Sequence, residues 1–161
     1  MAFRSGLIRR GSPHPPMRAA VTTRYGRPEV VEVREVPTPA PSGNEVLVRV
    51  RASSVCFGDR MFRSGPLLIR LLSGFRPKHP ILGVDLAGTV EAVGPSVTRF
   101  APGDAVYGAR GDKFAAHAEF ACVAVLRLIN LAHPANSGRA DDFVHTETGT
   151  GSNSHGIWLR L

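Results

Sequence analysis

Five glycines divide one stretch of the chain, residues 81 to 108 (ILGVDLAGTVEAVGPSVTRFAPGDAVYG), into short segments of strand-forming residues. They are Gly83, Gly88, Gly94, Gly103 and Gly108. Glycine inside strand-forming sequence marks a bend, a bulge or a place where another backbone comes close. The stretch therefore predicts a small, sharply bent β-barrel, and 17 glycines and 13 prolines in the chain also favour a β fold rich in turns.

An acidic residue, Asp85, interrupts the apolar start of this stretch. A buried carboxylate is costly unless it is hydrogen-bonded. We therefore expect that Asp85 either lines a cavity or caps a local turn.

Further strands are predicted before the central stretch. A strand to about Thr23, a turn at 25–28 and a second strand over 30–36 predict a hairpin. Residues 45–55 alternate inward valines with outward charged residues, which is typical of a half-buried strand. After it, residues 53–59 (SSVCFGD) predict a change from strand to short helix, a place where side chains are well held beside a ligand.

The spaced strings GVDLAGTVEAVG and GDAVYG resemble the GroES-like N-terminal catalytic domain of the medium-chain dehydrogenase/reductase superfamily. The closest resemblance is to its zinc-independent quinone oxidoreductase and NAD(P)-dependent alcohol dehydrogenase-like branch, which also has a run like AHAE at 116–119. The resemblance implies a mainly β fold, a GroES-like partly open β-barrel with two or three short helices. It covers about residues 17–123.

The resemblance leaves two ends of the chain outside the domain. Residues 1–16 are expected to be an untranslated or disordered leader, with an organelle transit peptide as the alternative. Residues 124–161 are expected to be a disordered tail unlike the family, so that the chain is truncated before a Rossmann domain. The string 149–154 echoes a dinucleotide-binding turn, but neither a buried strand nor a helix frames it.

The resemblance also implies site residues. Zinc-dependent relatives carry a metal-binding Cys at the position of Cys56, with Asp59 three residues on. The His–Glu pair that such enzymes need is replaced by Val84 and Asp85, so we expect no zinc and no other metal site. Cys56 and Asp59 remain as catalytic cleft candidates, Cys56 beside the nicotinamide edge and Asp59 as a cap of the helix start.

Each of these site residues also has a purely structural alternative. Cys56 could equally be a small buried hydrophobic residue. Tyr107, a weaker catalytic candidate, could be a core-edge residue whose hydroxyl meets water.

Residues 65–77 (GPLLIRLLSGFRP) form a short, basic and apolar segment. It could lie on a membrane surface. We expect instead that it packs over the barrel, because so short a helix is unstable alone. The resemblance places it in the wall of the substrate pocket, which implies an apolar substrate.

Charge and cysteine content exclude several classes of function. The net charge of +7 comes from 18 arginines and 2 lysines against 13 acidic residues, but the arginines are scattered, so we expect no nucleic-acid partner. Two cysteines make no disulfide framework, and a reducing, cytoplasmic location is expected. No apolar run is long enough to span a membrane, and no membrane partner is expected.

These observations give two functional hypotheses. The first is the catalytic domain of an NAD(P)(H)-dependent, zinc-independent oxidoreductase that reduces a small apolar carbonyl, enone or quinone, inactive without its nucleotide-binding domain. The second is a non-enzymatic barrel that binds a partner or assembles into a homo-oligomer.

Overall fold

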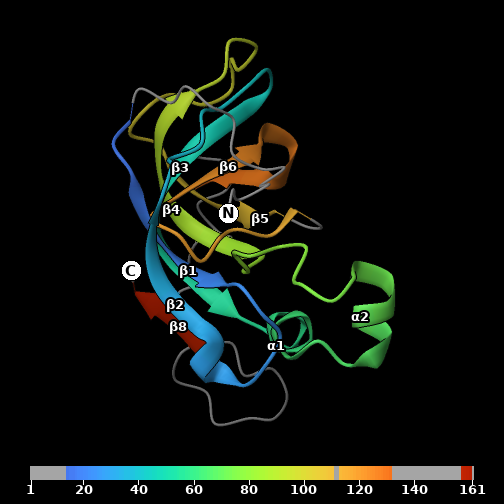
Figure 1. Cartoon of the computed structure of the whole chain (residues 1–161). Coiled ribbons are helices and arrows are strands. Elements are labelled where there is room, and N and C mark those ends of the chain that lie inside the picture. Colours follow the sequence, from blue (N-terminus) through green and yellow to red (C-terminus); the bar gives the residue numbers. More distant parts are fainter. Residues whose placement is uncertain (1–13, 111–112, 132–156, 161) are drawn as a thin grey trace, which may run out of the picture.

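A computed structural model describes residues 14–110, 113–131 and 157–160, and the fold is mainly β (Figure 1). A two-stranded antiparallel sheet pairs β1 with β2, and a larger sheet has the order β6-β3-β4-β5-β7 with β8 also paired to β3. The strands are β1 (Met17–Thr22), β2 (Val31–Val36), β3 (Glu45–Val55), β4 (Asp85–Val93), β5 (Ala105–Ala109), β6 (Phe120–Ala124), β7 (Leu128–Asn130) and β8 (Ile157–Arg160). The helices are η1 (Pro28–Val30), α1 (Phe57–Ser64), α2 (Leu67–Ser73) and η3 (Val125–Arg127), where η denotes a 3₁₀ turn.

The sequence-based fold class is confirmed. The sheets curve without closing, so the barrel is partly open, and two short α-helices lie at one end of it (Figure 1). The hairpin forms as expected, with Met17 opposite Val36 and Thr22 opposite Val31. The alternating segment forms β3 over the whole predicted range.

The main core is built on β3 and β4. Val46, Val48 and Val50 of β3 are buried and pack with Leu86 and Phe100. The alternation in β3 is incomplete, because Leu47 is also fully buried beside a register shift against β4. An irregular ladder of this kind bends the strand pair and lets the sheet curve.

The glycines of the central stretch allow close backbone approaches. A Cβ at Gly88 would lie 2.0 Å from the carbonyl oxygen of Arg49, and one at Gly108 would lie 2.0 Å from that of Arg127. Gly83 also adopts a left-handed φ of +89° at the start of the β4 region. The prediction of bends and close packing at these glycines is confirmed.

The small sheet is attached to the large one through residues just before β6. The amide of Ala20 donates to the carbonyl oxygen of His117 at 2.9 Å. Glu119 accepts from the backbone N–H of Arg18 and from its guanidinium, each at 2.8 Å. These bonds to Arg18 hold the pKa of Glu119 below its ordinary value.

We expect the Glu119 contact to give stability that depends on pH. Because the folded-state pKa is lower than the unfolded one, the contribution is complete at neutral pH and is lost as the pH falls below about 4.5. Urea denaturation should be measured at about pH 6 and about pH 3, which bracket the titration of carboxylates. On this acidification the free energy of unfolding of Glu119→Gln should fall less than that of the parent. An identical pH dependence in the two proteins would contradict this role.

The ordered fold continues beyond Val123, where the expected domain boundary lies. After β6 the chain makes η3 and then β7, which pairs with β5. Residues 157–160 pair with the end of β3 as β8. Residues 1–13 and 132–156, which contain most of the expected leader (1–16) and most of the expected tail (124–161), lie outside the described residues.

The segment around α2 differs from expectation. The prediction that its apolar side chains pack over the barrel is wrong, because Leu67, Leu68, Leu71 and Leu72 are each exposed by 64% or more. Across the described residues, no helix is both long and apolar enough to cross a bilayer.

Candidate functional site

The start of α1 is fixed by a reciprocal cap between Cys56 and Asp59. The Cys56 side chain accepts from the backbone N–H of Asp59, and Asp59 Oδ2 accepts from the N–H of Cys56 at 2.8 Å. The other carboxylate oxygen, Oδ1, accepts from the N–H of Gly83 at 2.8 Å. Asp59 is 3% exposed, so a buried carboxylate joins the start of α1 to the segment that leads into β4.

The expected capping role of Asp59 is thus present, and it occupies both carboxylate oxygens. Asp59 Oδ2 accepts from the N–H of Cys56 and Oδ1 from the N–H of Gly83, so each oxygen is bonded to the backbone. Asp59 thereby holds the backbone at the start of α1 against the segment that enters β4.

A layer of buried polar groups lies where β3 ends beside β4. Ser53 Oγ donates to the backbone oxygen of Asp85 at 2.8 Å, and Ser54 Oγ donates to Asp85 Oδ2 at 2.7 Å. His117 Nε2 lies 3.0 Å from the backbone oxygen of Ser54. A carbonyl oxygen can only accept, so this bond places the ring proton of His117 on Nε2.

Asp85 also lines a pocket, so of the two alternatives expected for it, a cavity residue or the cap of a local turn, the first is the one observed. The pocket has a volume of about 330 Å³. Its lining comes from the end of β3, the start of β4, β5 and the η3–β7 segment: Ser54, Asp85, Leu86, Tyr107, Gly108, Ala109, Arg127 and Ile129. Asp85 is therefore a cavity residue whose carboxylate accepts a hydrogen bond from a serine hydroxyl.

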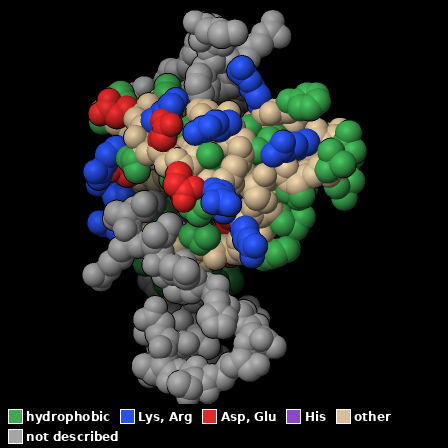
Figure 2. Space-filling model, turned by 60° about the horizontal axis from the view of Figure 1, so that its bottom comes forward, with side chains coloured by type: hydrophobic (Ala, Val, Ile, Leu, Met, Phe, Trp, Pro, Cys, Tyr) green, Lys and Arg blue, Asp and Glu red, His purple; other side chains and the backbone are tan. Residues whose placement is uncertain are grey.

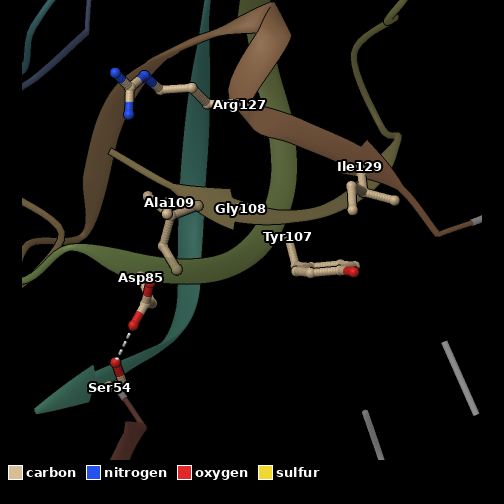
Figure 3. A pocket seen from close by; sticks show the side chains of 8 residues that line it. Ser54, Asp85, Tyr107, Gly108, Ala109, Arg127 and Ile129 are labelled. Carbon is tan, nitrogen blue, oxygen red and sulfur yellow. Dashed lines mark hydrogen bonds between the residues drawn. The ribbon is translucent and has the colours of Figure 1, made fainter. Parts of the chain in front are cut away.

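The close-up in Figure 3 shows how polar and apolar groups are distributed in the pocket. The Asp85 carboxylate points to Ser54 on one side, while the Tyr107 ring and Ile129 lie on the other. The side chain of Arg127 extends away from Tyr107. A mostly apolar pocket with a few polar groups is the usual form of a small-molecule site.

Only some of the predicted site residues meet in this pocket. Tyr107 lines it, whereas Cys56 and Asp59 lie at the α1 start and are absent from its lining. Sequence reasoning placed Ser54 in the segment 53–59 expected beside a ligand but did not name it as a site residue, although two serines at the end of a half-buried strand could have indicated a polar layer. It also missed Arg127 and Ile129, because both follow the boundary set at Val123.

The donor set does not fit a metal ion. Within the described ranges no three His, Cys, Asp or Glu side chains are grouped to hold one. Cys56 and Asp59 are engaged in the helix cap, and Asp85 is bonded to Ser54. A tetrahedral zinc site needs at least three such ligands free to converge.

The described residues also do not fit the phosphates of a dinucleotide. Every strand pair they form is antiparallel. A pyrophosphate is normally held by a glycine-rich turn between a parallel strand and a helix N-terminus, and that unit is not found in this part of the chain.

Comparison with known families gives a match over most of the chain. Residues 42–147 match the family described as the alcohol dehydrogenase GroES-like domain. The matched range includes β3 to β7 and thus all residues that line the pocket.

Individual relatives agree with the family match. A quinone oxidoreductase of Pseudomonas aeruginosa is 42% identical over 108 residues, which cover 66% of this chain and 31% of the relative. An NAD-dependent alcohol dehydrogenase of Sulfurisphaera tokodaii is 34% identical over 92 residues, covering 56% of this chain and 26% of the relative. The crystal structure of a quinone oxidoreductase from Pseudomonas syringae pv. Tomato superposes with a TM-score of 0.61 at 35% identity, covering 74% of this chain and 34% of that one. The chain thus spans roughly a quarter to a third of the proteins it matches.

Proposed function

The chain belongs to the alcohol dehydrogenase GroES-like domain family, and on this premise we propose that it is the substrate-binding catalytic domain of a nicotinamide-dependent oxidoreductase. The substrate is a small apolar carbonyl, enone or quinone, and the reaction uses no zinc. Relatives named as quinone oxidoreductase and NAD-dependent alcohol dehydrogenase support this class of reaction.

The observation that carries the proposal is the pocket between β3, β4, β5 and β7. Its volume of about 330 Å³ suits a small molecule, and its lining combines apolar side chains with the hydroxyl of Tyr107 and the Ser54–Asp85 pair. The family match covers the elements that form it.

Within this pocket we assign the hydrogen-bond donor to Tyr107. Tyr107 lines the pocket and pairs with Ile129 across the β5–β7 ladder. A phenol that donates to a carbonyl oxygen favours the negative charge that develops there during reduction. Since the described residues do not fit dinucleotide phosphates, the nicotinamide cofactor is assigned to a binding domain beyond them.

A ligand test addresses the pocket directly. Acetophenone is a suitable probe because it is an apolar ketone that does not alkylate cysteine. We expect Tyr107→Phe to weaken its binding by about fivefold, since one hydrogen bond is lost, when affinity is measured by ligand-observed NMR. The control Tyr25→Phe, in which the lost hydroxyl lies outside the pocket, should leave the affinity unchanged; equal effects of the two changes would contradict the assignment.

A cofactor test addresses the proposal that substrate and nicotinamide cofactor bind to different domains. Calorimetric titration of the chain with NADPH should show no binding, and no NADPH oxidation should occur with acetophenone, because the turn that cradles the pyrophosphate is not among the described elements. Saturable binding or steady turnover would show that this chain holds its own dinucleotide site.

A further inference from the structure

The short helix α2 attaches to the domain by its basic side and not by its apolar side. Arg70 Nε donates to the carbonyl oxygen of Gly65 at 2.6 Å, and its guanidinium lies 5.4 Å from the centre of the Tyr25 ring. The Tyr25 hydroxyl donates to the carbonyl oxygen of Arg76 at 3.1 Å just after the helix. Tyr25 therefore contacts the α2 segment twice, through its ring at Arg70 and through its hydroxyl at Arg76.

The leucines of α2 form one outward face. At 100° per residue, Leu67, Leu71, Leu68 and Leu72 fall within an arc of about 140°, and Arg70 lies outside it. Their exposed fractions are 74%, 72%, 64% and 76%, and that of the following Phe75 is 93%. We call these five residues the α2 apolar face. An amphipathic helix normally buries such a face, so this orientation needs a partner.

The charges around the α2 apolar face indicate the chemistry of that partner. Residues 60–84 contain no Asp or Glu, and their five basic residues are Arg60, Arg63, Arg70, Arg76 and Lys78. None of the five forms an ion pair with a carboxylate among the described residues. Figure 2 shows hydrophobic side chains with Lys and Arg beside them on the side where α2 lies, and acidic side chains elsewhere on this face. Arg70 is turned toward Tyr25, whereas Arg76 and Lys78 follow the leucines in the chain and are exposed, so within the described part of the chain they supply positive charge without an acidic partner.

From this arrangement we propose that the α2 apolar face docks on an anionic lipid bilayer. Leucine and phenylalanine side chains enter the boundary between headgroups and acyl chains, while arginine and lysine reach acidic headgroups at the same depth. A second copy docking by the same face would bring two basic segments together, because residues 60–84 contain no Asp or Glu. Docking of this kind lies in the bilayer surface and involves no membrane-spanning helix.

Vesicle flotation of the full chain tests the proposal. The chain should float with vesicles of phosphatidylcholine and phosphatidylglycerol and remain unbound with phosphatidylcholine alone, and added salt should weaken binding because it screens the charges. Equal binding to both vesicles, or binding to neither, would overturn the proposal. Absence of flotation together with dimerisation that is lost in Leu71→Glu would assign the face to a second copy instead.

Paired variants show whether vesicle binding depends on the α2 apolar face or on exposed leucines and arginines in general. Leu71→Glu with Leu72→Glu should lower partitioning by about tenfold or more, and Arg76→Gln with Lys78→Gln by about fivefold for each cation removed. The matched controls are Leu126→Glu, an 88% exposed leucine in η3, and Arg99→Gln, an exposed arginine between β4 and β5. Both controls should stay within about twofold of the parent. Because all altered residues are solvent-exposed, circular dichroism should show an unchanged fold, and an equal loss in the controls would contradict the assignment.

Discussion

Gly88→Ala is expected to destabilise the domain by about 3 kcal/mol or more. The added Cβ would lie 2.0 Å from the carbonyl oxygen and 2.9 Å from the carbonyl carbon of Arg49. Both atoms belong to the backbone of β3, so relief requires the two central strands to separate. Since Val48 and Val50 pack the core from the same strand, separation would also open the core.

Urea denaturation provides the measurement, with Gly43→Ala as the matched control. Gly43 has a left-handed φ of +50° but nothing within 4 Å of a Cβ, so its substitution should cost only about 1–2 kcal/mol from backbone strain. If Gly88→Ala proves as stable as the parent, or no worse than the control, the close approach of β3 and β4 is not a structural requirement.

Asp59→Ala is expected to have a similarly large effect, a loss of about 3 kcal/mol or more. The substitution leaves the partly buried N–H of Cys56 and the buried N–H of Gly83 without their acceptors. It also detaches the α1 start from the segment that enters β4. The free energy of unfolding, measured by urea denaturation, should fall accordingly.

Two further variants separate this buried contact from a general charge effect. Asp59→Asn keeps one acceptor oxygen, so about half of the loss should remain. Glu91→Ala removes a carboxylate that pairs with Arg49 on the surface and should cost about 1 kcal/mol or less. Equal losses in Asp59→Ala and Glu91→Ala would contradict a connecting role for Asp59.

Sequence reasoning succeeded where the residue pattern itself fixes the local structure. The alternation over 45–55 defined β3, and the glycines from 83 to 108 marked the close approaches and bends of β4 and β5. The predicted cap at Asp59 was also confirmed, because an Asp at the third helical position has few other local uses.

Other features depend on partners that lie far away in the sequence. The apolar spacing in α2 predicts a leucine face, but whether that face turns inward depends on Tyr25, which anchors the opposite side. The pocket likewise depends on the pairing of β5 with β7, which brings Ile129 beside Tyr107. Neither contact leaves a local pattern in the chain.

The most direct test of the proposed substrate pocket is an amide-resolved NMR titration of the full chain with acetophenone. We expect saturable shifts at Ser54, Asp85, Tyr107 and Ile129, and little change at the α2 leucines. Shifts confined to α2, or no saturable shift at the pocket residues, would contradict the view that β3, β4, β5 and β7 together form a substrate site.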